Sequence, residues 1–325
     1  SLPVRKRRIQ EKEEHMWGSE RRSISISTGK ERLMSEENRK AIRISVRNLV
    51  EFVLRSGDID NRRSGNAQKD AMLAGGRIHR KIQKRMGSGY RAEVPLKHEV
   101  QDEEQEITLL VEGRADGIFT ENGIPVIDEI KGMYTDISRL EEPIEVHLAQ
   151  AMCYGYFYCC DKDLDGIRLQ MTYCNLETEE IKRFQTDRSR EELETWFSSV
   201  VHEYFKWARY LYHHELTRDA SIGHLEFPFP YRAGQRDLVV SVYRTVSRKK
   251  RLFIQAPTGI GKTLSTVFPA VRAIGEGKGD KLFYLTAKTV TRTVAEEAFR
   301  ILRDHGLIFT SVTITAKEKL CPMDE

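Results

Sequence analysis

The chain has 325 residues, of which 39% are hydrophobic and 31% are charged, and its formal net charge is +4. This length allows two domains with separate cores, and the composition is ordinary for a soluble globular enzyme. No apolar run approaches the roughly 20 residues that a membrane-spanning helix needs, and the charged N-terminus lacks the core of a signal peptide. Five cysteines in irregular spacing favour a reducing cytosol over a disulfide framework. We therefore expect a cytoplasmic protein.

Residues 1–40 are expected to form a disordered extension, because residues 1–33 are rich in Arg, Lys, Glu and Ser without apolar periodicity. The first ordered domain, 41–215, is predicted to be mixed α/β. Its expected elements are helices at 46–54 and 68–86, strands at 92–100, 107–111, 117–120 and 124–130, a helix after Pro143, hairpin strands at 167–175 and 180–185, and a helix of about 25 residues that begins at Ser189.

Two details of these elements bear on function. Ala74-Gly75-Gly76 in the second helix predicts close packing or the approach of a substrate, because glycine there lowers helical stability. A basic cluster from Arg77 to Arg85 on the same helix is able to line a surface that binds phosphates, as are clusters at 244–251 and 278–288. The alternative for each basic cluster is a solvated face.

Two apolar runs that end in acid flank Asn122-Gly123, which is a strong signal for a hairpin turn. Glu129 and Lys131 are two residues apart on one expected strand, so their side chains leave the same face. Asp116, on the partner strand, can reach that face. Acids beside a lysine at the end of a sheet suit a hard divalent cation and an attacking water. The alternative is a solvated hairpin with surface charges.

Four short motifs occur in order around these acids. They are Gly75-Gly-Arg-Ile-His79, Gly113-Arg-Ala-Asp116-Gly, Glu129-Ile-Lys131 and Gln150-Ala-Met-Cys-Tyr154. Each motif alone has a structural explanation, such as packing for Tyr154. Together they resemble the RecB-like branch of the PD-(D/E)XK nuclease superfamily over residues 42–210.

This resemblance implies a restriction-endonuclease-like fold with a mixed sheet, and a metal-dependent nuclease site. The implied ligands of Mg²⁺ or Mn²⁺ are the side chains of His79, Asp116 and Glu129 and the carbonyl of Ile130. Lys131 would orient or help to deprotonate the attacking water and stabilise the charge of the pentacovalent phosphate. Gln150 and Tyr154 would contact the DNA backbone.

Some relatives in this branch carry an iron–sulfur cluster held by cysteines around the nuclease domain. Cys153, Cys159, Cys160 and Cys174 lack a C-x₂-C spacing. We therefore expect no cluster in this domain, and predict that these cysteines are small buried residues.

After a linker at 216–230, the pattern changes to alternating helices and strands. The expected elements are a helix at 232–248, a strand at 251–255, a helix at 262–274, a strand at 281–286 and a helix at 290–305. This alternation predicts a parallel sheet of the βαβ kind for the domain 231–325. Only about two strands of such a sheet precede residue 325, so we expect a C-terminally truncated fragment.

The turn between the first strand and helix of this domain has the pattern of a phosphate-binding loop. Its residues are Ala256, Pro257, Thr258, Gly259, Ile260, Gly261, Lys262 and Thr263. The loop directs backbone N–H groups and a helix N-terminus toward a β-phosphate. Lys262 would neutralise phosphate charge and Thr263 would bind Mg²⁺, while Ala256 replaces the first glycine of the strict G-x₄-G-K-[ST] pattern.

The residues on both sides of this loop, 229–235 and 284–289, complete a second resemblance. Residues 229–325 resemble the start of a superfamily 2 helicase of the XPD/DinG type, with a P-loop (RecA-like) motor. Arg232 and Gln235 would then contact adenine, and Thr286 and Lys288 would contact DNA. Cys321 would be the first ligand of a [4Fe–4S] cluster, whose other ligands belong to a full-length chain. We expect this incomplete motor not to hydrolyse ATP productively.

The leading hypothesis is a fragment of a DNA helicase–nuclease. Its N-terminal domain would cleave DNA with a divalent metal, coupled in the full chain to ATP-dependent unwinding. The expected partners are ATP and DNA that is single-stranded or has single-stranded ends, with no membrane. Two alternatives stay open: an ATP-dependent helicase whose nuclease-like domain only binds DNA, and a nucleotide-binding regulator or scaffold.

Overall fold

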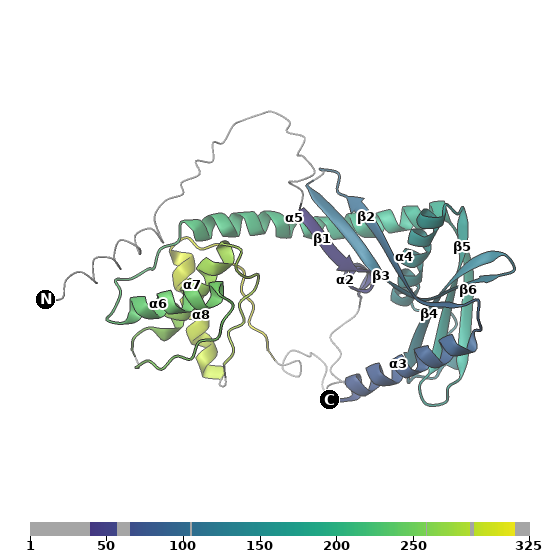
Figure 1. Cartoon of the computed structure of the whole chain (residues 1–325), viewed down its shortest axis with the longest axis horizontal. Coiled ribbons are helices and arrows are strands. Elements are labelled where there is room, and N and C mark those ends of the chain that lie inside the picture. Colours follow the sequence, from purple (N-terminus) through teal and green to yellow (C-terminus); the bar gives the residue numbers. More distant parts are fainter. Residues whose placement is uncertain (1–39, 57–65, 105, 258, 287–288, 316–325) are drawn as a thin grey trace. The chain divides into compact units, whose positions relative to one another are not determined.

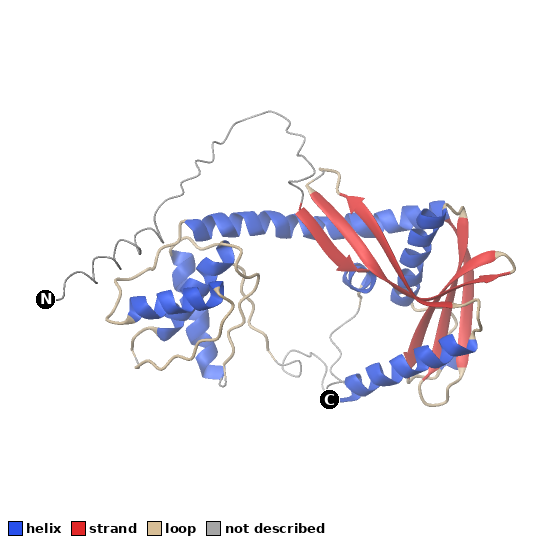
Figure 2. Cartoon of the chain, viewed as in Figure 1, coloured by secondary structure: helices blue, strands red, loops and turns tan. Residues whose placement is uncertain are grey.

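The computed structural model describes residues 40–56, 66–104, 106–257, 259–286 and 289–315. A six-stranded mixed sheet with its helices is followed along the chain by a group of three helices (Figures 1 and 2). The elements are β1 (Lys40–Ser45), α2 (Val46–Leu54), α3 (Asn66–Arg85), β2 (Arg91–Gln101), β3 (Ile107–Glu121), β4 (Ile124–Met133), the 3₁₀ helix η2 (Ile137–Arg139), α4 (Glu145–Lys162), β5 (Gly166–Asn175), β6 (Ile181–Ser189), α5 (Arg190–Gly223), α6 (Gln235–Ser247), α7 (Lys262–Gly275) and α8 (Thr289–Asp304). The predicted α/β class with a mixed sheet is confirmed.

Strand β3 pairs with three other strands. It runs parallel to β1 from Ile107 to Glu112 and antiparallel to β4 from Gly117 to Glu121. Strand β2 pairs with β3 from Thr108 to Ile118, and so overlaps both of these ladders. Strands β1 and β4 therefore occupy successive halves of one edge of β3, and residues 113–116 lie between them. The order continues from β4 to β5 to β6.

Side chains alternate between the two faces of β4, and each face is covered by a different helix. Ile130 packs with Ile78 and Ile82 of α3 in a small buried cluster. Ile127 belongs to the main core, together with the buried residues of α4. Helix α3 approaches β4 closely, because a Cβ atom on Gly132 would come within 3.6 Å of the Gly75 Cα atom. The prediction of close packing at this glycine pair is confirmed.

The predicted helices, apart from the one that begins after Ser189, and the strands at 92–100 and 124–130 are found with small shifts of their ends. The predicted hairpin turn is also confirmed, since Asn122 and Gly123 both have positive φ angles, of 52° and 81°. Strand β1 was not predicted, and the two strands expected at 107–111 and 117–120 form one continuous strand.

Helix α5 has 34 residues and continues to Gly223, so residues 216–223 of the expected linker are helical. Its N-terminus carries a capping box, in which Ser189 and Glu192 bond each other's backbone amides. Near its C-terminus, Ile222 is buried against α7, where a Cβ atom on Gly275 would come within 2.5 Å of Ile222 Cγ2. The last turns of α5 thus contribute to the core of the helices that follow.

The prediction of strands at 251–255 and 281–286 is wrong. Both segments are described, and neither of them joins a ladder. Most of their apolar side chains are exposed, with 94% of Phe253 and 88% of Leu285 accessible to solvent, while Leu282 is half-buried against the helical core. A strand requires a hydrogen-bonded neighbour, and an apolar run indicates strand propensity without providing that neighbour. The parallel sheet predicted for this domain is therefore not formed by the described residues.

Helices α6, α7 and α8 nevertheless share a buried core. It includes Val239 of α6, Val271 of α7 and Leu302 of α8. In the described part of the chain, no helix is both long enough and apolar enough to cross a lipid bilayer.

Candidate active site

Asp116 lies in the short stretch of β3 between its ladders with β1 and β4. The β3–β4 ladder ends at the pair formed by Gly117 and Asp128. Two residues further along β4, the Ile130 amide donates a 2.7 Å hydrogen bond to Asp116 Oδ2. The Asp116 carboxylate therefore takes the place of a backbone carbonyl as the partner of the Ile130 amide. It is held at the point where β3 and β4 stop pairing.

Helix α3 supports Asp116 from a second direction. His79 Nδ1 lies 3.3 Å from Asp116 Oδ1, and both side chains are largely buried. One turn later, Gln83 Nε2 donates to the Asp116 carbonyl at 3.0 Å and to Glu93 Oε1 at 3.3 Å. Burial lowers the pKa of His79, but its hydrogen bond to Asp116 and the charge of that carboxylate outweigh burial, so the pKa is raised. Gln83 was missed by the sequence analysis, although its position four residues after His79 was the available signal.

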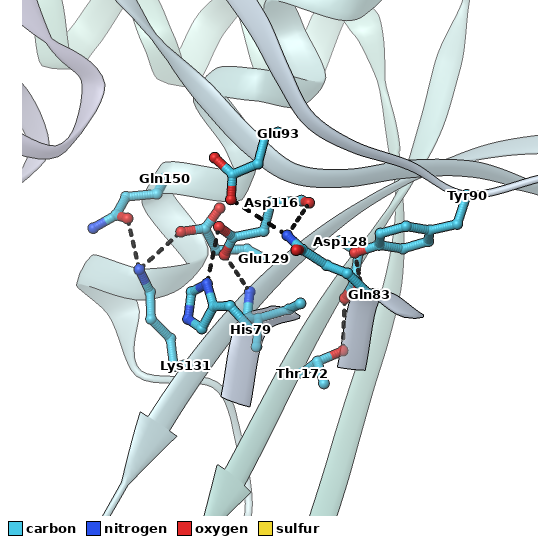
Figure 3. Close-up of polar contacts among 11 residues, drawn as sticks. His79, Gln83, Tyr90, Glu93, Asp116, Asp128, Glu129, Lys131, Gln150 and Thr172 are labelled. Carbon is cyan, nitrogen blue, oxygen red and sulfur yellow. Dashed lines mark hydrogen bonds and ion pairs between the residues drawn. The ribbon is translucent and has the colours of Figure 1, made fainter. Parts of the chain in front are cut away.

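Lys131 joins β4 to helix α4. Its Nζ atom donates to Glu129 Oε1 and to Gln150 Oε1, each at 2.8 Å (Figure 3). Glu129 is only 4% exposed, and burial raises its pKa to about 7 while the Lys131 ammonium opposes that rise. The second carboxylate oxygen, Glu129 Oε2, is buried and has no hydrogen-bond partner among the described residues. Such an atom is costly unless a further group satisfies it.

Asp128, next to Glu129, leaves the opposite face of β4 and is fully buried. Its carboxylate accepts hydrogen bonds from Tyr90 at 2.9 Å and from Thr172 at 2.6 Å (Figure 3). It also accepts one from Gln170 at 3.0 Å. Burial raises the pKa of Asp128, and these three donors oppose the rise. This side chain thus ties β4 to β5 and to the turn before β2. The sequence analysis did not identify Tyr90.

The residues proposed as metal ligands have suitable chemistry for a hard divalent cation. They offer two carboxylates, an imidazole and a backbone carbonyl, from His79, Asp116, Glu129 and Ile130. The unpartnered Glu129 Oε2 is a buried oxygen of the kind that a cation satisfies. Among the described residues, however, no three His, Cys, Asp or Glu side chains converge as a ready-made metal cage. His79 instead contacts Asp116 Oδ1, and Lys131 contacts Glu129 Oε1, so a cation that uses these atoms would have to replace these contacts.

Gln150 and Tyr154 both point from α4 toward the strands and are each 5% exposed. The Tyr154 ring lies against Gly113 of β3, where a Cβ atom would come within 2.6 Å of the hydroxyl. The Arg114 amide also hydrogen-bonds that hydroxyl. Tyr154 therefore supports the strand that carries Asp116, and its contact with DNA, like that of Gln150, stays a prediction.

The four cysteines of this domain are placed close to expectation. Cys153, Cys159 and Cys174 are buried, which confirms the prediction for these three, while Cys160 is only half-buried. Burial raises the pKa of Cys159 to about 11, so its thiol is protonated near neutral pH.

The phosphate-binding loop is described except for Thr258. Gly259 and Gly261 have positive φ angles of 86° and 79°, and α7 begins directly after them at Lys262. Lys262 Nζ donates to the carbonyls of Ala256 and Pro257 at 3.0 and 2.8 Å, so the lysine folds back over its own loop. The predicted turn and helix start are therefore present, although the preceding segment is not a strand.

Arg232 and Gln235, expected to contact adenine, lie against this loop. The Arg232 guanidinium donates to the Gly259 carbonyl, and Gln235 Oε1 accepts from the Arg232 amide at 3.0 Å. Gln235 Nε2 lies so close to Gly261 that a Cβ atom there would come within 2.7 Å of it.

The structure describes only some of the other residues proposed to bind ATP, DNA or a cluster in the domain 231–325. Tyr284, which the sequence analysis did not single out as a site residue, has its hydroxyl 3.5 Å from Thr263 Oγ1. Thr286 follows on the same exposed segment. Thr258, Lys288 and Cys321 lie outside the described residues.

Comparison with known proteins gives limited similarity. No protein-family model matches the chain. Over 52 residues, or 15% of this chain, it is 36% identical to "Probable ATP-dependent helicase MJ0942" of Methanocaldococcus jannaschii. The match spans 8% of the length of that protein, so the similarity concerns a small part of each. The structure titled "Crystal structure of SSO0001" aligns with 62% of this chain and 86% of its own, at 16% identity and a TM-score of 0.33. A score this low does not carry an argument about fold.

Proposed function

We propose that the sheet domain of this chain is a metal-dependent nuclease that cleaves DNA, fused to part of an ATP-driven helicase. One observation carries the nuclease proposal. Side chains from α3, β3, β4 and α4, distant in sequence, meet in two adjoining hydrogen-bonded groups around the carboxylates of Asp116 and Glu129. The members of these groups are His79, Asp116, Glu129, Lys131 and Gln150. A solvated hairpin with surface charges would not bury both acids in this way.

The chemistry of each group fits phosphodiester cleavage. A divalent cation held by His79, Asp116, Glu129 and the Ile130 carbonyl would act as a Lewis acid and lower the pKa of a bound water. Lys131 is fixed by two oxygen acceptors, so its ammonium is held in place before a substrate arrives. A positioned cation of this kind stabilises negative charge that develops on phosphate oxygens, and needs little reorganisation to do so.

The helicase part of the proposal rests on the phosphate loop and on the similarity over 52 residues to a protein named as a probable helicase. Lys262 at the start of α7, with N–H groups of the helix N-terminus beside it, offers a site for the phosphates of ATP. Arg232 and Gln235 contact the glycines of the loop, and this position beside the phosphate site supports the prediction that they contact the adenine of ATP. The [4Fe–4S] cluster and the coupling of unwinding to cleavage are proposals for a longer chain.

A cleavage assay tests the nuclease directly. The chain is incubated with labelled single-stranded DNA and Mg²⁺ or Mn²⁺, and is compared with Lys131→Ala. We expect cleavage that requires the metal, and a rate about 10²- to 10³-fold lower in the variant, the usual effect of removing one donor to a developing oxyanion. Lys182→Ala is the control, because Lys182 of β6 donates to the carbonyls of Ser138 and Leu140 and lies over the Phe184 ring, and none of these contacts involves Asp116 or Glu129. Equal, metal-independent cleavage by all three proteins would exclude the proposal.

Metal binding has a test that is independent of cleavage. Mn²⁺ at about 100 times its dissociation constant should stabilise the fold by about 2.7 kcal/mol, measured as a shift of the thermal midpoint. Asp116→Asn should abolish this shift, while Asp136→Asn, which alters an exposed carboxylate, should retain it. A shift of the same size in both variants would place the metal elsewhere.

The main alternative is a helicase whose sheet domain holds DNA without cutting it. The internal pairing favours this alternative, since both Asp116 oxygens and Glu129 Oε1 already have partners in the described arrangement. Of these four carboxylate oxygens, Glu129 Oε2 alone lacks a partner among the described residues. DNA binding without metal-dependent cleavage, and without a thermal shift from Mn²⁺, would support it.

A further inference from the structure

Helix α3 presents three different surfaces around its axis. Ile78 and Ile82 are buried against β4. His79 and Gln83, each one residue further along, contact Asp116 (Figure 3). One more residue adds about 100° of rotation around a helix. The side chains of Arg80 and Lys84 therefore leave the helix next to the face that carries His79 and Gln83.

The four basic residues in the last turns of α3, from Arg80 to Arg85, fall into two groups with different surroundings. Lys81 forms an ion pair with Glu179, and Arg85 lies within the electrostatic reach of that carboxylate. Arg80 and Lys84 are exposed, and no ion pair joins either to an acid within the described part of the chain. The stretch of α3 from residue 73 to residue 85 contains no Asp or Glu. Of the two groups, the one that borders the active site is thus the one without an acidic partner.

We propose that Arg80 and Lys84 bind the phosphate backbone of a single-stranded nucleic acid and lead the strand past Asp116 into the candidate active site. The two positions are one helical turn apart, with about 5–6 Å between their Cβ atoms, so they can meet neighbouring phosphates of one strand. This inference rests on the proposed nuclease function, and adds to it the surface by which the substrate enters.

The physical basis of this binding is the release of counterions. Each phosphate that a protein cation neutralises frees ions condensed on the strand, and this lowers affinity as salt rises. For a single strand, each contact contributes about 0.7 to the slope of log affinity against log salt concentration. Two contacts therefore contribute about 1.4, a change that a titration resolves.

The experiment measures fluorescence anisotropy of a labelled oligothymidylate with the 325-residue chain in EDTA, which prevents metal-dependent cleavage. The double variant Arg80→Gln/Lys84→Gln should reduce the salt slope by about 1.4 and weaken binding most at low salt. Lys81→Gln/Arg85→Gln removes the same charge from the other flank of the same helix, and should leave the slope unchanged. Thermal midpoints of both variants confirm that they are folded.

Equal losses of slope in the two double variants would overturn the inference, because binding would then depend on overall charge rather than on this face. No loss in either variant would overturn it as well. Failure of the proposed function is distinguishable from failure of this inference. If the chain never cleaves DNA, but its salt slope falls only when Arg80 and Lys84 are replaced, the binding surface is supported and the nuclease activity is not.

Discussion

Gly117 shows how single residues hold the candidate site together. It pairs across the ladder with Asp128, and the Tyr90 ring covers it to reach the Asp128 carboxylate. A Cβ atom on Gly117 would lie 1.8 Å from the Tyr90 ring and hydroxyl, a distance that no side chain can occupy. The glycine that follows Asp116 in the sequence motif is therefore required by packing on the opposite face of the strand.

Gly117→Ala should displace Tyr90 and leave a buried acceptor of Asp128 without its donor. We expect a loss of stability of about 2–4 kcal/mol, from overpacking and the broken hydrogen bond together. The measurement is urea unfolding followed by the fluorescence of Trp196 and Trp207 on α5. Gly89→Ala is the control, because a Cβ atom there meets nothing within 4 Å. Similar midpoints for the two variants would contradict this account of Tyr90.

At the scale of whole elements, α5 depends on how it begins. The Ser189 hydroxyl accepts from the Glu192 amide at 3.1 Å, and the Glu192 carboxylate accepts from the Ser189 amide at 2.9 Å. Ser189→Ala should therefore destabilise the fold by about 1 kcal/mol, the usual cost of losing an N-cap. Ser199→Ala, in the exposed middle of the same helix, should change stability by less than about 0.5 kcal/mol. A larger effect at Ser199 than at Ser189 would argue against the role of the cap.

The elements differ in how far the sequence predicts them. Helices were found because their apolar faces and caps are local features, as Ser45 shows at the start of α2. Strand β1 was missed because a six-residue strand with charged Lys40 and Arg43 resembles a loop until its parallel partner is known. For the segment 251–255 the prediction was wrong in the opposite way, because an apolar run suggested a strand but the segment joins no ladder. Pairing is a property of two segments, so one segment cannot reveal it.

The candidate site was predicted in the same uneven manner. His79, Asp116, Glu129, Lys131 and Gln150 were recognised from their order, and the structure joins them through hydrogen bonds. The groups that orient them were not recognised. Gln83 stands four residues after His79 on one helix, and this spacing was the available signal. Tyr90 acts through a contact with Asp128 on a distant strand, and such a contact leaves no spacing in the sequence to detect.

For the molecule as a whole, the two candidate sites use separate sets of residues. Lys131 bonds Glu129 and Gln150, whereas the hydrogen bonds of Lys262 within the described residues go to carbonyls of its own loop. Sites without shared contacts usually act additively. Nucleotide binding and DNA cleavage by this chain should therefore be separable by single substitutions.

Lys262→Ala should weaken the binding of a fluorescent ATP analogue by about 10- to 100-fold, because a hydrogen bond to a charged group contributes about 1.5–3 kcal/mol. The same variant should cleave single-stranded DNA at the unaltered rate in the absence of ATP, while Lys131→Ala should show the reverse pattern. Lys206→Ala, at an exposed position on α5 outside the basic clusters, is the control for loss of charge. Loss of both activities in Lys262→Ala would contradict the independence of the sites.

The division of one edge of β3 between β1 and β4 restricts where the length of this chain can vary. The stretch between Glu112 and Gly117 acts as a spacer of fixed length, since both ladders hold its ends. An insertion or deletion of one residue there would slip one of the ladders and turn Asp116 toward the opposite face of the sheet. A change of length in a connection outside both ladders, such as residues 276–279 after α7, disturbs neither register. Tolerance of insertions thus depends on a count of residues in β3, and not on how exposed those residues are.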